Sequence, residues 1–177
     1  MSEPYNYIFV SVQDSAGYYT FTTKADTEYR IAFHPDETLS SCVKEGTPLG
    51  NIYQISVYIA SGNGNYDSGT SKTITSIIEA FFANDQDALL YVCDDTDNKG
   101  SKRFRHFDMW YNDSSMTDYI TKLDNIIPFS SDDEEPLITI HTSLLYHNNN
   151  TNKANIHYAY YNIKKVVNGE KPDNEAD

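Results

Sequence analysis

The chain of 177 residues is long enough to bury one substantial core, and its length favours a single domain. It has 13 lysines and arginines against 26 aspartates and glutamates, a formal net charge of −13. This balance argues against direct nucleic-acid binding, because phosphate affinity depends on clustered cations, and we expect any protein partner to be basic or neutral. The same charge also fits the simpler interpretation that an acidic surface keeps the protein soluble.

Neither a signal peptide nor a membrane span is predicted. The first ten residues lack a basic segment followed by an apolar run, and no apolar run approaches the roughly 20 residues that span a bilayer. The two cysteines, Cys42 and Cys93, are too few for a disulfide framework and too isolated for a metal knuckle. We therefore expect a cytoplasmic protein without a cofactor.

The first third of the chain predicts an antiparallel meander. Residues 7–12 and 18–23 are rich in β-branched and aromatic side chains, and residues 14–17 between them form a typical turn sequence. In residues 28–33 apolar and polar side chains alternate, so this third strand should bury one face. A loop follows, within which residues 39–44 are compatible with a helical turn.

A fourth strand is predicted over residues 52–60. Its more apolar side chains should point inward, and they are Tyr53, Ile55, Val57 and Ile59. Residues 72–83 then give the clearest helical pattern, with apolar side chains three and four positions apart. Thr70 or Ser71 is the expected cap of this helix.

Residues 89–93 predict a short buried strand, in which Cys93 acts as a small apolar side chain. Residues 101–111 predict a second helix, capped by Ser101, with an aromatic stripe that should pack on the sheet. The stripe consists of Phe104, Phe107 and Trp110 or Tyr111.

The last part of the chain is less regular. Residues 116–129 predict a helical turn and then a strand stopped by Pro128, and residues 131–135 predict a solvated acidic loop. Residues 137–145 predict another strand. Residues 155–163 fit either a returning strand or a final helix, and their β-rich composition favours the strand.

The expected fold is α+β: a mostly antiparallel sheet of about five to seven strands with about two amphipathic helices packed on it. Residues 1–167 should form one domain, and residues 168–177 a polar tail that we expect to be disordered.

The segment from residue 91 to residue 112 concentrates the chemistry of the chain. Aspartates follow the predicted buried strand and arginines lie in the next helix, and the end of a strand before a helix is where open sheets often build sites. The candidate binding residues are Asp94, Asp97, Arg103, Arg105, His106 and Trp110.

Three interpretations of this segment compete. In the first, which we favour, an aspartate pairs with Arg103 or Arg105 and closes the loop. In the second, one or both arginines bind a carboxylate or phosphate of a ligand or partner. In the third, Asp94, Asp97 and His106 bind a divalent metal or transfer protons, although no known catalytic motif supports this and no catalytic residue is assigned.

The chain also carries 15 tyrosines, many of them on predicted strands. Alternation along a strand cannot bury every ring, so part of the sheet should expose aromatic side chains of the kind enriched at protein interfaces. The alternative is that tyrosine simply suits strands.

Two patterns within residues 91–112 resemble a family of small bacterial proteins known only as a domain of unknown function. They are a strand end Tyr-x-Cys-Asp-x-x-Asp (Tyr91, Cys93, Asp94, Asp97) and a helix Arg-x-Arg-x-Phe-x-x-Trp (Arg103, Arg105, Phe107, Trp110). The resemblance covers residues 5–111, whereas the last 65 or so residues match no known pattern. The resemblance implies a shared fold, but it does not assign an activity to the chain.

We expect a cytosolic binding or regulatory module that acts through protein–protein contact. One alternative is a small metal-dependent phosphoester hydrolase that uses Asp94, Asp97 and His106, with Arg103 or Arg105 on the phosphate. Another is an acidic mimic of nucleic acid, in which residues 132–135, residues 94–97 and the tail form one stripe on a protein that occupies a DNA-binding partner.

Overall fold

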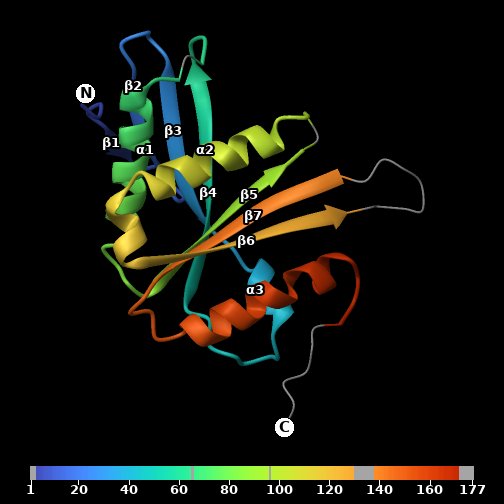
Figure 1. Ribbon diagram of the computed structural model, residues 1–177. Coiled ribbons are helices and arrows are strands. Elements are labelled where there is room, and N and C mark those ends of the chain that lie inside the picture. The colour runs from blue at the N-terminus through green and yellow to red at the C-terminus, as the bar shows by residue number, and fades with distance from the viewer. Residues whose placement is uncertain (1–2, 65, 96, 130–137, 172–177) are drawn as a thin grey trace.

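A seven-stranded sheet forms the centre of the protein (Figure 1). The structure is a computed structural model that describes residues 3–64, 66–95, 97–129 and 138–171. The strands are β1 (Ile8–Val10), β2 (Tyr18–Thr22), β3 (Glu28–Pro35), β4 (Asn51–Ser61), β5 (Asp87–Asp94), β6 (Ile120–Phe129) and β7 (Ile138–His147). Their order in the sheet is β1-β2-β3-β4-β5-β7-β6, and all neighbours are antiparallel except β4 and β5, which are parallel.

Helices cover both faces of this sheet. Helices α1 (Ser68–Phe81) and α2 (Gly100–Asn112) pack on one face, and α3 (Lys153–Val167) with the 3₁₀ turn η1 (Thr38–Cys42) packs on the other. A second 3₁₀ turn, η2 (Ser115–Asp118), leads into β6. The α+β class predicted from the sequence is confirmed. Among the described residues, no helix combines the length and apolar character needed to cross a bilayer.

Strand β5 explains why the sheet needs helices on both sides. Leu89 and Cys93 belong to the core beneath α1 and α2, whereas Ala88 and Leu90 belong to the core beneath α3. Successive side chains of a strand point to opposite faces, so an uninterrupted apolar strand must be covered twice. The predicted short buried strand over residues 89–93 is therefore the centre of a three-layer domain.

Helix α3 corrects the expectation of a strand over residues 155–163. The buried side chains of this segment are Ile156, Ala159, Tyr160, Asn162 and Ile163. Most of these lie three or four positions apart, which is the spacing of one helix face. The strand favoured by the β-rich composition was wrong and the alternative, a final helix, is what forms, because tertiary packing selects the helical face.

The caps of α1 and α2 also differ from the prediction. Helix α1 begins at Ser68, and its cap is Asp67, whose Oδ1 accepts from the Thr70 main-chain nitrogen at 2.8 Å. Before α2, Asp95 Oδ1 accepts from the Gly100 main-chain nitrogen at 2.9 Å, so Ser101 is not the cap. The cap residue of α2 is Lys99, whose side chain makes no capping bond, so Asp95 serves the first main-chain N–H of the helix from the preceding loop. Such N–H groups need an outside acceptor because they have no partner within the helix.

Strand β6 continues through Pro128, which was expected to stop it. Because β6 is an edge strand, the missing N–H of proline leaves no neighbour unpaired. The helical turn predicted before this strand corresponds to η2, and the one predicted over residues 39–44 corresponds to η1. The acidic loop of residues 131–135 and the end of the tail, residues 172–177, lie outside the described residues.

We predict that Phe107→Ala, on α2, lowers the free energy of unfolding by about 3–5 kcal/mol, because the ring is 2% exposed and stacks on Tyr91 at 4.0 Å. Met109→Ala on the same helix is the matched control, since its side chain is 57% exposed and the change should stay within about 0.5 kcal/mol. Urea unfolding measures both. Equal losses in the two variants would contradict this account of the core.

Candidate functional site

The parallel strands β4 and β5 are paired over only four residues each. The pairs run from Asn51 with Asp87 to Gln54 with Leu90. Beyond these pairs, β4 remains paired with β3 as far as Ser61, and β5 remains paired with β7 as far as Asp94. The carboxyl-terminal halves of the two strands therefore diverge, as Figure 1 shows, and the sheet opens between them.

A cavity of about 430 Å³ lies at this opening. Val57 and Ile59 of β4, Tyr91 of β5 and Ile74 of α1 give it an apolar floor. The sequence predicted that Ile59 points inward into the core, but it is 46% exposed, because β5 no longer lies beside this part of β4.

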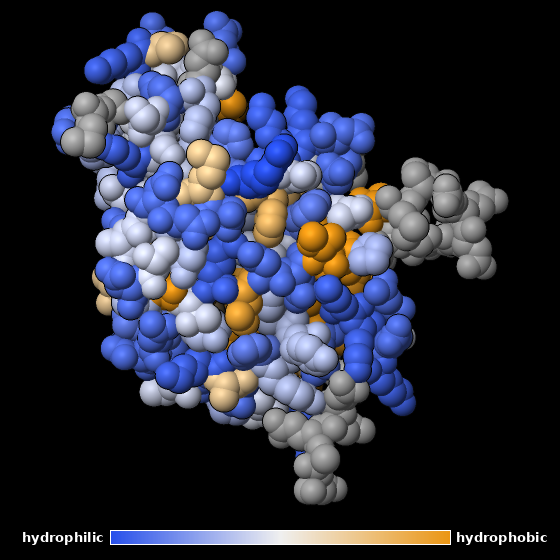
Figure 2. All heavy atoms as spheres, viewed as in Figure 1, coloured by the Kyte–Doolittle hydropathy of each residue, from blue (hydrophilic) through white to orange (hydrophobic). Residues whose placement is uncertain are grey.

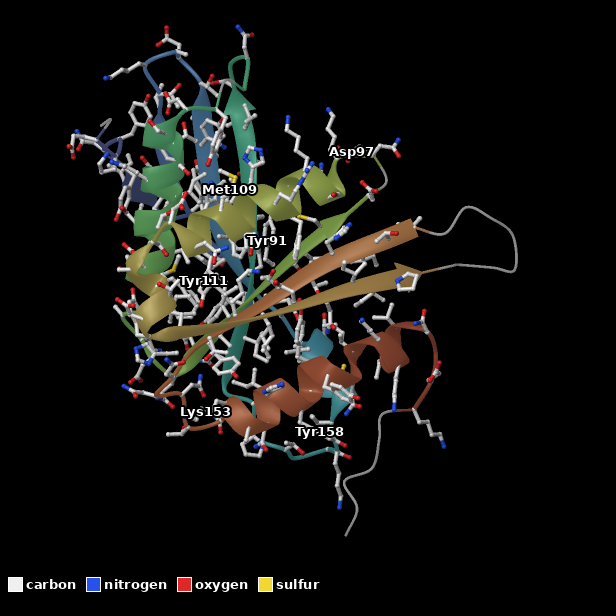
Figure 3. All side chains as sticks on the ribbon, in the orientation of Figure 1. Tyr91, Asp97, Met109, Tyr111, Lys153 and Tyr158 are labelled. Carbon is white, nitrogen blue, oxygen red and sulfur yellow. The ribbon has the colours of Figure 1, made fainter. Side chains whose placement is uncertain are left out.

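One side of helix α2 forms a wall of the cavity. Lys102, Arg103, His106 and Trp110 lie about one turn apart and face the opening. The first turn of the helix is held on β5, because the Tyr91 hydroxyl donates to the main-chain oxygen of Arg103 at 3.4 Å. Figure 3 shows Tyr91 beneath α2 and Asp97 just before the helix begins.

Cations predominate among the charged groups of this cavity. Lys99, Lys102 and Arg103 contribute three positive charges, and Asp97 contributes one negative charge. In a chain with a net charge of −13, this is a local reversal of sign. A ligand that carries negative charge is therefore attracted to this opening and repelled by most of the remaining surface.

Asp97 and Arg103 form an ion pair at the mouth of the cavity. The Arg103 guanidinium donates to Asp97 Oδ2 at 2.7 Å, while Asp97 Oδ1 accepts from the Lys99 main-chain nitrogen at 3.1 Å. The hydrogen bond from Arg103 lowers the pKa of the Asp97 carboxyl, and the same bond raises the pKa of Arg103. Both side chains are close to half exposed, so solvent screens the pair and it contributes little to stability.

The structure brings together four of the six residues predicted to form a binding site: Asp97, Arg103, His106 and Trp110 line the cavity. Arg105 is exposed on α2 and is not among the lining residues, and the side chain of Asp94 lies outside the described part of the chain. The pairing of an aspartate with an arginine, favoured from the sequence, is present as Asp97 with Arg103. That these residues bind a ligand stays a prediction.

Several lining residues were missed by the sequence analysis. Lys99 and Lys102 carry a signal that could have found them, since they stand close to Arg103 in a chain poor in cations. Tyr66, Val57 and Ile59 carry no such signal, because the sequence does not show where two strands part.

The arrangement gives little support to a metal centre. Among the residues that the structure describes, no three histidines, cysteines, aspartates or glutamates are grouped closely enough to hold a metal ion. Asp97 is paired with Arg103, and the His106 ring packs edge-on against Tyr66 with 5.1 Å between ring centroids.

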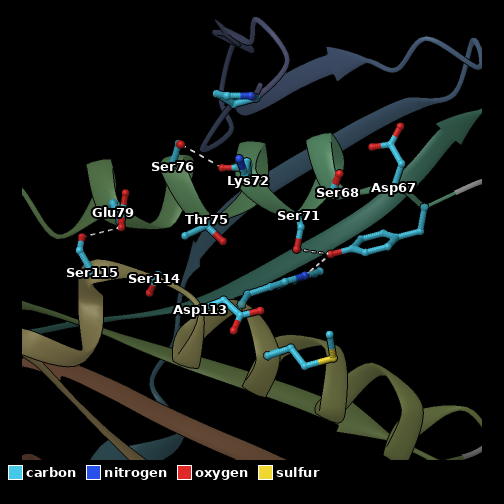
Figure 4. A pocket seen from close by; sticks show the side chains of 14 residues that line it. Asp67, Ser68, Ser71, Lys72, Thr75, Ser76, Glu79, Asp113, Ser114 and Ser115 are labelled. Atoms are coloured by element: carbon cyan, nitrogen blue, oxygen red, sulfur yellow. Dashed lines mark hydrogen bonds between the residues drawn. The ribbon is translucent and has the colours of Figure 1, made fainter. Parts of the chain in front are cut away.

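A second cavity, of about 620 Å³, lies between α1 and α2 (Figure 4). Tyr66 and Trp110 line both cavities and form the wall between them. Their rings stack with 6.0 Å between centroids, the indole N–H donates to the Tyr66 hydroxyl, and that hydroxyl donates to Ser71 Oγ at 2.8 Å. Serine, threonine and carboxylate side chains line the rest of this cavity from α1 and from residues 113–115, which follow α2, and Met109 lines it from α2.

The surface around these cavities is mainly hydrophilic. On the face shown in Figure 2, apolar residues appear in small separate groups among hydrophilic ones. A broad apolar docking patch is not visible on this face.

These observations define the class of the protein: an α+β domain with one parallel strand pair that opens into a cationic cavity. The chain belongs to DUF6169, a family of unknown function, whose model matches residues 66–162, more than half of the chain. Comparison with the curated proteins and with the solved structures gave no match.

The resemblance to a family of unknown function is thereby confirmed, but its extent differs. The match begins at Tyr66 and reaches into α3, whereas the resemblance seen in the sequence covered residues 5–111. The patterns between Tyr91 and Trp110 lie within the match, which does not test their individual positions.

We predict that Arg103→Gln raises the pKa of Asp97 toward the ordinary value of about 3.9. Because the folded-state pKa of Asp97 is lowered, its contribution to stability is present above the ordinary pKa and is lost as the pH falls through the folded value. NMR titration of the Asp97 carboxyl carbon measures the shift. Lys102→Gln is the control and should leave this pKa nearly unchanged, and an unchanged pKa in Arg103→Gln would refute the pairing.

Proposed function

We propose that this protein binds an organic ligand bearing a phosphate or another anionic group in the cavity where β4 and β5 diverge. The observation that carries the proposal is the coincidence of this cavity with a local excess of cations at the carboxyl ends of a parallel strand pair. Ligands of open sheets commonly bind at such ends, because the strands stop there and the loops are free to surround a guest.

The two parts of the cavity suggest two parts of the ligand. The floor of Val57, Ile59 and Ile74 favours an apolar or ring-shaped portion. The cations at the mouth favour several anionic oxygens, as in a phosphate, since Arg103 can donate from a planar guanidinium and the lysines from mobile ammonium groups. The proposal therefore adopts the second interpretation of the sequence, in which an arginine binds a carboxylate or phosphate of a ligand. In the structure, Arg103 is paired with Asp97, as the first interpretation expected.

Intrinsic fluorescence provides a direct test, because Trp110 is the only tryptophan and lines the cavity. We expect a saturable change in its emission on titration with adenosine diphosphate or coenzyme A. Lys102→Ala should weaken binding about three- to tenfold, and added salt should weaken it further. Lys44→Ala, an exposed lysine beside η1 at the other face of the sheet, is the matched control. Titrations in which neither compound changes the emission would rule out the proposal.

A second candidate function is contact with another protein, the expectation drawn from charge and tyrosine content. Its support is the edge strand β1, where Ile8 is 65% and Phe9 54% exposed. An open edge offers main-chain groups to an added strand. The partner would be basic or neutral and the location cytoplasmic. The nucleic-acid mimic requires residues 132–135, which lie outside the described residues.

For this second candidate, we expect affinity purification from the native host to recover a partner that is lost with Ile8→Lys, because a charge on the edge opposes strand addition. Ile126→Lys is the matched control: this side chain is 53% exposed on β6, at the opposite edge of the sheet. Recovery of the same partner by both variants, or of none by the unaltered protein, would count against β1 as the contact.

A further inference from the structure

The geometry points to a ligand whose anionic group is joined to a slender, extended arm containing amide groups, and we propose that this arm lies between β4 and β5 and pairs with both. Coenzyme A and its acyl thioesters belong to this chemical class. The inference rests on the proposed function and adds the shape and hydrogen-bonding chemistry of the ligand.

The first support is the main chain of the two diverging strands. The outer edge of β4 is occupied by β3 and that of β5 by β7, over nearly their whole lengths. Their inner edges are paired with each other only as far as Gln54 and Leu90. In a strand, main-chain N–H and C=O groups point in turn to each edge, so residues 55–61 and 91–94 present donors and acceptors to the space between them.

Main-chain polar groups are costly when they are withdrawn from water without a partner, so a ligand that enters this space should supply donors and acceptors of its own. Two strands that start as neighbours and then diverge pass through the separation at which one further extended chain fits between them, about twice the 4.8 Å strand spacing. An amide group can pair with both sides there, as a strand does in a sheet. A purely hydrocarbon arm cannot do so.

The second support is steric. Helix α2 crosses one face of the opening, and Phe107 packs flat on Tyr91 with 4.0 Å between ring centroids. A peptide strand would send a side chain toward this face at every second residue. An arm without large side chains avoids the clash, which favours a small amide-containing molecule over a protein strand.

The third support is the position of the cations. Lys99, Lys102 and Arg103 stand at the mouth of the cavity, just beyond the end of β5. The part of β5 beyond its pairing with β4 covers four residues, or about 13 Å at roughly 3.3 Å per residue. An arm of this length holds two amide groups joined by a short spacer, with its anionic end against the cations.

Hydrogen–deuterium exchange tests the arm separately from the anion. Coenzyme A and pantetheine, which has the arm but no phosphate, should slow exchange of amides in residues 55–61 and 91–94. Adenosine diphosphate, which has the phosphates but no arm, should leave these amides unchanged while still perturbing Trp110 fluorescence. Coenzyme A should also bind about tenfold more tightly than adenosine diphosphate.

The outcomes separate the two proposals. If adenosine diphosphate and coenzyme A bind equally and neither protects the inner edges, the arm is refuted and the anion site stands. If neither binds, the proposed function fails as well. Protection by pentaglycine but not by coenzyme A would overturn the small-molecule arm in favour of a peptide.

A pair of matched variants adds a steric control. Ile59→Trp fills the cavity and should weaken coenzyme A and pantetheine at least about tenfold. Ile126→Trp makes the same substitution at a 53% exposed isoleucine of β6 that is not among the lining residues, and it should leave binding within about twofold. Urea unfolding confirms that both variants are folded. Unchanged binding in Ile59→Trp would refute the placement of the arm.

Discussion

The short parallel pairing of β4 and β5 is the constraint on which the rest of the structure depends. Parallel neighbours need a crossover connection, and α1 supplies it between these two strands. As a result, both strands run toward the same side of the sheet, and described residues of the loops before α1 and α2 line one cavity there. The cavity, its cations and the wall shared with the second cavity all follow from this single arrangement.

Helix α2 serves two purposes because its sides differ in chemistry. Phe107 fixes the helix on β5 through its stack on Tyr91, whereas Lys102 and His106 remain beside the opening. Trp110 contributes both to the packing of the helix and to the lining of the openings, since it is 7% exposed yet lines both cavities. The packing that stabilises the domain thus also fixes the position of the charged groups.

Local patterns in the sequence predicted most of the elements and part of the site. The apolar positions of α1, the aromatic stripe of α2 and the alternation in β3 depend on near neighbours, so they are readable without a structure. The segment around Asp97 and Arg103 stood out for the same reason.

The remaining features depend on partners distant in the chain. Residues 155–163 look like a strand until the face that meets η1 and β7 is known, and Ile59 looks like a core residue until the neighbour of β4 is seen to depart. Periodicity states which side chains share a face. It does not state whether that face is covered, and the opening in the sheet is therefore invisible in the sequence.

The brief contact between β4 and β5 also has a mechanical meaning. It divides the sheet into a half made of β1 to β4 and a half made of β5 to β7, joined by one short seam of main-chain hydrogen bonds. Side chains join the halves on both faces of the sheet, in one core beneath α1 and α2 and in another beneath α3. Side-chain packing therefore carries most of the contact across the seam, and a ligand that pairs with both strands would add main-chain hydrogen bonds to it.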